Sequence, residues 1–365
     1  MSELINETSN QHFISQSELR FNAVDPTRLN SLIKINRFRL VDRENHKVKK
    51  PEKKRIRDIS CNNDIFTLAI IDSEKRINME KFFRHFEDQY NGVVTNFLSA
   101  IKTKVDKTLA GTVSIDGSEF YSDIKFLQKI KFMNFLRNPH NIHTALETFD
   151  FAKDYIVHGT GGDFQLIINA LLKNEKGQRD YICNTYGVTN KEFDSWIKLI
   201  LLFVYHDEQM RNPVLDGMIE EFFRAKELYT AVIIGYYSED TKNCPLIPDT
   251  GSIVYPDMTF YFNVSRNCFV TLKHLKLDSE EGREITKKAL ECMGEPFTEK
   301  SFECFKNIQA AKNFISIHIN DEEILSGYNK ICITESAQFV YSGSSKILGA
   351  DVIQVREHQD TSTPQ

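Results

Sequence analysis

The chain has 365 residues, of which 41% are hydrophobic, 11% aromatic and 27% charged, a composition typical of a folded protein with a sizeable core. It excludes collagen-like, low-complexity and wholly disordered chains. The formal net charge of -5 does not draw the whole molecule to nucleic acid or to an anionic membrane, so such binding needs a local basic patch.

Cysteine spacing and hydropathy give an expectation for location. The seven cysteines lie apart from one another, without the close pairs of a zinc ribbon or of a disulfide-dense secreted module. The first residues lack the basic and apolar segments of a signal peptide, and no apolar run reaches the roughly 18 residues that a membrane span needs. We therefore expect a cytoplasmic protein with no membrane partner.

The first fifth of the chain predicts a small β-rich region at residues 10–75, after a disordered N-terminus at residues 1–9. Residues 32–41 alternate between apolar and polar side chains, and residues 64–71 are largely apolar, so both favour strands. Residues 43–57 between them read RENHKVKKPEKKRIR. So few apolar residues in a charged segment predict a solvated loop.

Helical spacing dominates residues 76–229, where a long helix is expected to begin after Asn78, a good N-cap residue. Thr189 and Glu192 have the spacing of a capping box at the start of a later helix. The same periodicity predicts further helices at residues 120–136, 143–158, 163–173, 191–204 and 213–229.

Residues 230–356 are of mixed character, and residues 357–365 predict a disordered tail. β-branched and aromatic stretches predict strands at residues 230–237, 258–264 and 269–272. Helical spacing returns after them and predicts helices at residues 302–317 and 321–328. No repeat or Pro-rich linker separates independent domains. We expect one compact, helix-dominated α+β unit at residues 10–356, with a β-rich N-terminal part and a short sheet in the C-terminal third.

His12 is the most suggestive candidate for chemistry. It stands just before an apolar pair and a polar turn, and a histidine at a strand end followed by a loop, a second strand and a helix is the layout of His-metal finger nucleases. In such a site the histidine deprotonates a water, and a divalent metal stabilises the leaving oxygen. His12 would then be the base, with Mg²⁺ or Mn²⁺ held by Glu80 and His85. The alternative is a partly buried histidine that is hydrogen-bonded within the fold.

Two carboxylates follow in the first long helix. Glu80 and Glu87 are seven residues apart and lie on one side of a helix, with Arg84 one turn from each. The two glutamates could coordinate a metal ion or share a proton. The alternative is an ion-pair network with Arg84.

Arg137 and Asp249 complete the set of candidate catalytic residues. Arg137 stands where a helix stops before Pro139, and its guanidinium could bind a phosphate or cap the preceding turn. Asp249 lies in a turn-rich segment after a strand, where we expect it to be exposed at the apex. It could serve a site or form an Asx-turn.

The basic segment supplies the candidate nucleic-acid contacts, with Phe38 and Phe66 as flanking surfaces for stacking. The alternative is a solvated loop without a partner. The candidate contact residues are Lys49, Lys50, Lys53, Lys54 and Arg55.

Several segments between residues 10 and 341 together resemble the uncharacterised domain-of-unknown-function family 4238. QHFISQSEL at residues 11–19 is similar to its opening His-aromatic-(Ile/Val)-Pro signature, with Ser15 in place of the proline. The other similar segments are MEKFFRHFE at residues 79–87, RNP at 137–139, IPDTG at 247–251 and FYFNVS at 260–265. The resemblance implies one co-operating domain but no activity. It also implies that five polar residues lie close together in the fold, namely His12, Glu80, Glu87, Arg137 and Asp249.

These observations lead to a ranked set of hypotheses. The first is an effector of microbial conflict or antiviral defence that acts on a phosphate-bearing substrate as a metal-dependent nuclease or phosphodiesterase with a His base. The second is a non-catalytic recognition module that binds a protein or nucleic-acid partner in a defence assembly. A third is an enzyme that acts on a nucleotide or a small phosphorylated metabolite in the same cleft.

Overall fold

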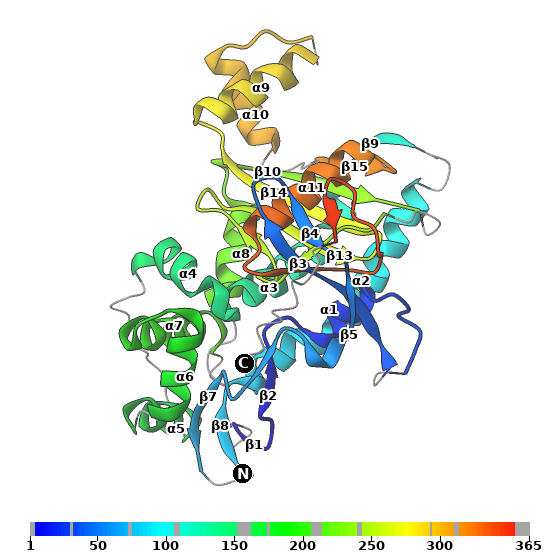
Figure 1. Ribbon diagram of the computed structural model, residues 1–365. Coiled ribbons are helices and arrows are strands. Elements are labelled where there is room, and N and C mark those ends of the chain that lie inside the picture. The colour runs from blue at the N-terminus through cyan, green and yellow to red at the C-terminus, as the bar shows by residue number, and fades with distance from the viewer. Residues whose placement is uncertain are drawn as a thin grey trace.

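A computed structural model describes ten segments of the chain, and Figure 1 shows their arrangement. The fold mixes helices and sheets, which confirms the predicted α+β class at that level. The described residues are 4–29, 32–71, 75–105, 110–151, 162–173, 176–205, 214–238, 243–292, 294–309 and 314–354.

A six-stranded sheet lies in the middle of the molecule (Figure 1). Neighbouring strands are antiparallel except for the parallel pair β10 and β15. Its order is β12 (Ile253–Val254), β13 (Thr259–Ser265), β14 (Cys268–Lys276), β10 (Leu228–Tyr236), β15 (Phe314–Ile319) and β9 (Gly111–Asp116). Strands are thus confirmed within 230–237, 258–264 and 269–272.

The helix predicted at residues 302–317 is wrong in its second half. α10 (Glu299–Gln309) ends before that range does, and Phe314–Ile319 is strand β15. Ile315, Ile317 and Ile319 are buried and alternate along β15, which is the period of a strand. The parallel partner β10 is distant in sequence, so this pairing is not visible in the local pattern.

Helices cover both faces of the central sheet. α2 (Glu80–Val105), α3 (Tyr121–Arg137) and α8 (Val214–Arg224) share one large core with the strand residues Val232, Ile234 and Phe262. α11 (Glu322–Glu335) packs in a second core with Phe269 of β14 and with Phe38 of the second sheet. The alternation of side chains along each strand explains why one sheet serves two cores.

A second sheet contains the basic segment, so the solvated loop predicted at residues 43–57 is wrong. β4 (Lys47–Lys49) and β5 (Glu52–Arg55) both pair with β3 (Lys34–Asp42), and η2 (Ile56–Asp58) follows. Val48 and Ile56 are buried and anchor an otherwise charged segment. The remaining strands of this sheet are β11 (Ile247–Pro248), β16 (Phe339–Ser342) and β17 (Asp351–Ile353).

The N-terminal strands form two smaller sheets. β1 (Ile5–Asn6), β8 (Arg76–Asn78) and β7 (Thr67–Ile70) make one, and β2 (Asn10–His12) with β6 (Cys61–Asn63) makes the other. Ile5 and Asn6 are therefore paired, although we expected disorder throughout residues 1–9. The predicted tail at residues 357–365 lies outside the described residues.

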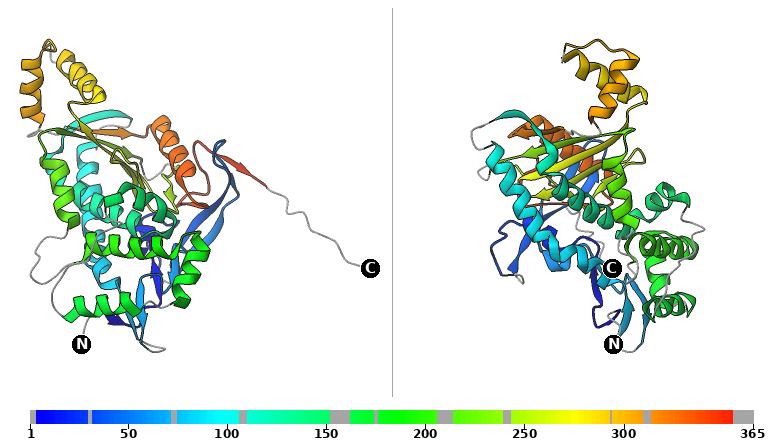
Figure 2. Two further views of the ribbon diagram at one scale, coloured as in Figure 1. Left: turned by 90° about the vertical axis from the view of Figure 1, so that its left-hand side faces the viewer. Right: turned by 180° about the vertical axis from the view of Figure 1, so that it is seen from behind.

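The remaining helices surround this framework. α9 and α10 lie at one end of the molecule, away from α5, α6 and α7 (Figures 1 and 2). The predicted capping box at Thr189 and Glu192 is confirmed. None of the described helices has both the length and the apolarity that crossing a membrane requires. The bounds are α1 (Gln16–Phe21), η3 (Gly117–Glu119), η4 (Pro139–Asn141), α4 (Ile142–Thr148), α5 (Gly162–Lys173), α6 (Lys176–Tyr186), α7 (Asn190–Val204) and α9 (Glu280–Cys292).

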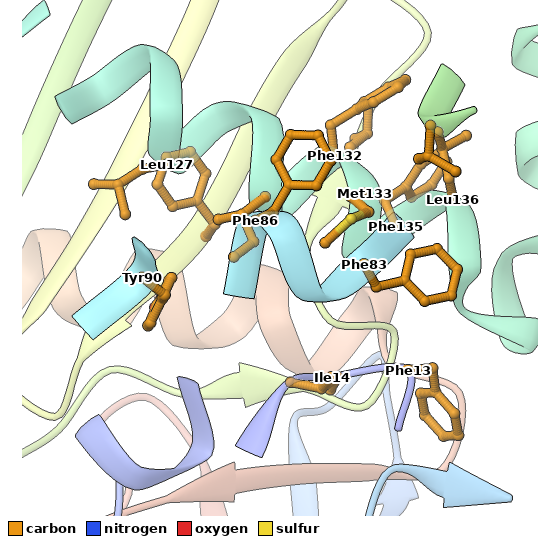
Figure 3. Close-up of a cluster of buried hydrophobic side chains, with 14 of the residues drawn as sticks. Phe13, Ile14, Phe83, Phe86, Tyr90, Leu127, Phe132, Met133, Phe135 and Leu136 are labelled. Atoms are coloured by element: carbon orange, nitrogen blue, oxygen red, sulfur yellow. The ribbon is translucent and has the colours of Figure 1, made fainter. Parts of the chain in front are cut away.

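The aromatic faces of α2 and α3 meet over the N-terminal segment. Figure 3 shows Phe83 and Phe86 of α2 facing Phe132 and Phe135 of α3, with Phe13 beside them. All five side chains are buried in one core. This packing holds the residues after β2 against the first turns of α2 and the last turn of α3.

Candidate functional site

His12 is positioned by the short β2–β6 ribbon. Its neighbour Gln11 is fully buried, and the Gln11 Oε1 atom accepts a hydrogen bond from the Phe66 amide (2.6 Å). His12 itself lies opposite Cys61 in the ribbon. Its Nε2 atom is buried and has no hydrogen-bond partner among the described residues. A fixed backbone thus holds a ring whose outer nitrogen is unsatisfied.

The surroundings of His12 keep its ring neutral. Burial and then the nearby Arg137 charge lower its pKa from 6.5 to about 4, against an opposing backbone hydrogen bond with Arg57. Because Nε2 has no partner, the bond with Arg57 falls to Nδ1, so Nε2 carries the free lone pair. His12 is therefore an unprotonated base at neutral pH.

Glu80 begins α2, where the Asn78 Oδ1 atom accepts a hydrogen bond from the Glu80 amide (3.2 Å). Burial raises the pKa of Glu80 from 4.5 to about 7, while the Arg137 charge lowers it and the Glu87 charge raises it. Its Oε1 atom is buried and finds no hydrogen-bond partner in the described part of the chain. At neutral pH this carboxyl is about half protonated.

Arg137, at the end of α3, acts electrostatically on both groups, while its own hydrogen bonds go to other residues. Its Nη2 atom donates to Glu87 Oε1 (2.6 Å) and to Asn134 Oδ1 (2.9 Å), and its Nε atom donates to the Phe13 carbonyl (3.2 Å). The guanidinium also lies 4.9 Å from the centre of the Phe83 ring. The side chain is only 1% exposed, so Arg137 orders the site rather than presenting a charge to a ligand.

Three residues that sequence reasoning missed extend this network inward. Glu18 and Lys131 form an ion pair with no exposed side-chain surface. Asn134 connects the pair to Arg137, because its Nδ2 atom donates to Glu18 Oε2 (2.7 Å). The available signal was a lysine and an asparagine three residues apart in a largely apolar helix.

The prediction that Asp249 is exposed is wrong, since it is 2% exposed. Its carboxylate accepts backbone hydrogen bonds from Ala337 (2.7 Å), Gln338 (2.7 Å) and Phe339 (2.8 Å). The burial has a physical reason, because these donors satisfy both oxygens and fix the chain that enters β16. Asp249 is a structural residue rather than a surface carboxylate.

The turn that carries Asp249 nevertheless lies against the end of α3. Asn138, next to Arg137, donates from Nδ2 to the Asp249 carbonyl (2.8 Å). Gly251 has a φ of 85°, and a Cβ atom there would lie 3.4 Å from the Cβ atom of Asn134. The positive φ favours glycine at this position, and the turn is in ordinary van der Waals contact with α3. The structure thus places the Arg137 charge near His12 and Glu80 and pairs it with Glu87, while the Asp249 turn contacts Asn138 at the end of α3.

The predicted metal pair Glu80 and His85 is not brought together. The two positions point about 140° apart around an α-helix, and His85 is exposed whereas Glu80 is mostly buried. Arg84, on the same exposed side, pairs with Asp88 (3.9 Å) instead of with the glutamates. Within the described ranges, no group of three or more His, Cys, Asp or Glu residues is arranged to hold a metal ion.

The candidate nucleic-acid-binding residues lie on the segment that leads into η2, where the Arg57 backbone is hydrogen-bonded to the His12 ring. Phe38 and Phe66 are fully buried, so neither can stack on a base. The five cations are distributed over β4, the following residue and β5, with Lys50, Lys53 and Arg55 exposed, Lys49 half-buried and Lys54 paired with Glu52 (3.1 Å).

Comparison of the chain with protein-family models, curated proteins and solved structures gave no match. The resemblance to family 4238 therefore stays a prediction, and the functional argument depends on the geometry described above.

Proposed function

We propose that this chain is a hydrolase of phosphate-bearing substrates, with His12 as general base and Glu80 as proton donor. One observation carries the proposal: the Nε2 atom of His12 and the Oε1 atom of Glu80 are buried without hydrogen-bond partners among the described residues, and the Arg137 charge acts on both side chains. Unsatisfied buried polar atoms cost stability, so their presence calls for an explanation in function.

The protonation states suit these roles. The mechanism requires that substrate binding opens access to these two buried atoms; neutral His12 then takes a proton from the attacking water, and Glu80, with a pKa of about 7, gives one to the leaving oxygen. The pKa of His12 is low in the free protein, about 4. A bound phosphate places negative charge beside the ring and raises this pKa, which makes the base effective when substrate is present.

The basic segment supports the substrate class. Lys53 and Arg55 project from β5 into solvent, and η2 follows directly. Arg57 in η2 has the backbone hydrogen bond with the His12 ring. Exposed cations a few residues before Arg57 can guide a phosphate toward the histidine that this backbone holds.

The test is cleavage of single-stranded oligonucleotides and of bis(p-nitrophenyl) phosphate, measured with Mg²⁺, with Mn²⁺ and with EDTA. We expect His12→Gln and Glu80→Gln each to reduce the rate at least about 100-fold without lowering the melting temperature. His85→Gln is the matched control, because this exposed histidine lies on the same helix and should leave the rate unchanged. Full activity of His12→Gln would refute the mechanism.

A recognition module is the second candidate, because Arg137 and Asp249 make hydrogen bonds that only stabilise the fold. This role would involve the exposed Lys53 and Arg55 instead. It predicts oligonucleotide binding without cleavage under all three metal conditions, and loss of that binding in Lys53→Gln/Arg55→Gln.

A further inference from the structure

A polar hollow of about 370 Å³ is lined by Cys61, the residue paired with His12, although His12 itself does not line it. The hollow is open to solvent and lies between the β2–β6 ribbon and Tyr181 of α6, which are distant in sequence. Its lining consists of three asparagines, a cysteine and a tyrosine, namely Asn10, Asn62, Asn63, Cys61 and Tyr181.

The asparagines give the cavity a wall of amide donors and acceptors. Two of them are held in place, since Asn62 donates from Nδ2 to the Tyr186 hydroxyl and the Asn10 side chain is hydrogen-bonded to Cys61. An amide offers a donor and an acceptor side by side, which matches the edges of nucleobases, as in the pairing of asparagine with adenine. A charged ligand group would find no charged partner among these lining residues.

Tyr181 supplies an aromatic surface at the same place. Its side chain is 54% exposed on α6, in contrast to the fully buried Phe38 and Phe66. Bases of single-stranded nucleic acids are commonly bound by stacking on such a ring while their edges are read by polar side chains. The combination of amides and one exposed ring is therefore suited to an unpaired base.

The spacing connects this cavity to the candidate catalytic base. Asn10 and His12 are alternate residues of β2, so their side chains lie on one face about 6.6 Å apart along the strand. Cys61 is paired with His12 across the ribbon, and Asn63 with Asn10. A ribose ring spans a similar separation between a base and its phosphate.

We propose that this cavity is a nucleobase subsite, which holds the base of a nucleotide or of single-stranded nucleic acid while the attached phosphate lies at His12. The inference rests on the proposed function in that it names the substrate of the same site. It also narrows the substrate class, because simple phosphate esters would leave the cavity unused.

The test is isothermal titration calorimetry of the full chain with AMP and with ribose 5-phosphate, which lacks the base. We expect AMP to bind at least about tenfold more tightly than ribose 5-phosphate, and Tyr181→Ala to remove that advantage. Tyr181→Phe should bind AMP within about twofold of the wild type, because the stacking ring remains. Phe151→Ala is the control, since Phe151 is another exposed aromatic residue and does not line the cavity.

Equal affinity for AMP and ribose 5-phosphate, or no effect of Tyr181→Ala on AMP, would overturn the subsite. So would Tyr181-dependent binding of methyl glucoside as tight as that of AMP, which would indicate a sugar site. The two proposals fail separately. Tyr181-dependent AMP binding without any cleavage would contradict the hydrolase and support the subsite. Cleavage at the same rate with and without a nucleobase on the substrate would support the hydrolase and contradict the subsite.

Discussion

Two groups of polar side chains meet where α2 and α3 contact the N-terminal segment, and they differ in whether an opposite charge faces each of them. In the inner network, Glu18 faces Lys131 and Glu87 faces Arg137, with Asn134 hydrogen-bonded to both pairs. In the outer pair, His12 and Glu80 each keep one buried atom without a partner in the described structure.

This difference separates stability from function. In the inner network each buried charge faces an opposite charge, which offsets part of the cost of burying it and fixes the packing of the helices. The unpartnered atoms of His12 and Glu80 have no such compensation, so we expect that these two residues are retained for function. We therefore expect substitutions in the network to change mainly stability, and substitutions in the pair to change mainly activity and pH dependence.

The largest effect is expected from Lys131→Met, which leaves the buried Glu18 carboxylate without its cation. Breaking one side of a buried ion pair costs about 3 to 5 kcal/mol in the free energy of unfolding. Urea unfolding monitored by circular dichroism measures it. Lys129→Met is the control on the same helix, because Lys129 pairs with Asp216 (2.9 Å) near the surface and should cost under about 1 kcal/mol.

A loss of stability no larger for Lys131→Met than for Lys129→Met would show that the inner network is not what holds these elements together. The double variant Glu18→Leu/Lys131→Met sharpens the result. Because it removes both charges, we expect it to be more stable than Lys131→Met alone.

The outer pair predicts a pH dependence of stability that begins at neutral pH for Glu80. Glu80 has a pKa of about 7 in the folded chain, against an ordinary value of 4.5, so folding favours its protonated form. The stability that it contributes in acid is lost as the pH rises through 7. Compared with Glu80→Gln, the wild type should lose about 3 kcal/mol of unfolding free energy between acid and mildly alkaline pH.

His12 has the opposite sign, because its pKa of about 4 lies below the ordinary 6.5. The stability present above 6.5 is lost as the pH falls through 4, again by about 3 kcal/mol relative to His12→Gln. Urea unfolding of the wild type and both variants across this range tests the pair. Difference curves that stay flat would mean that both groups are solvated.

The sequence predicted some of this comparison and could not predict the rest. Helical periodicity located α2 and α3. Of the residues grouped by their types, the structure pairs Glu87 with Arg137 and places the Arg137 charge near His12 and Glu80, and their common function stays a prediction. The roles within the site depend on partners far away in the chain. Neither Glu18 nor Lys131 is unusual locally, and only their contact across the core makes them important.

The same limit explains the wrong predictions. Asp249 has the sequence context of an exposed turn. Its carboxylate is nevertheless covered by a segment that lies 88 to 90 residues later in the chain. The charged composition of β4 and β5 does not predict strands. Both segments form strands because they pair with β3 and because Val48 is buried, and these long-range interactions outweigh the local composition.

Glu87 belongs to both groups and gives the smallest expected effect, since it pairs with Arg137 but also raises the pKa of Glu80. Glu87→Gln keeps an acceptor for Arg137, and its side chain is 26% exposed, so the cost in stability should stay near about 1 kcal/mol. Removing its charge lowers the pKa of Glu80, because Arg137 then acts on that carboxyl unopposed. In Glu87→Gln, the pH midpoint of the Glu80-dependent stability change should therefore move toward acid. An unchanged midpoint would mean that the two groups are electrostatically independent, and that the paired Arg137 does not set the protonation of the unpartnered pair.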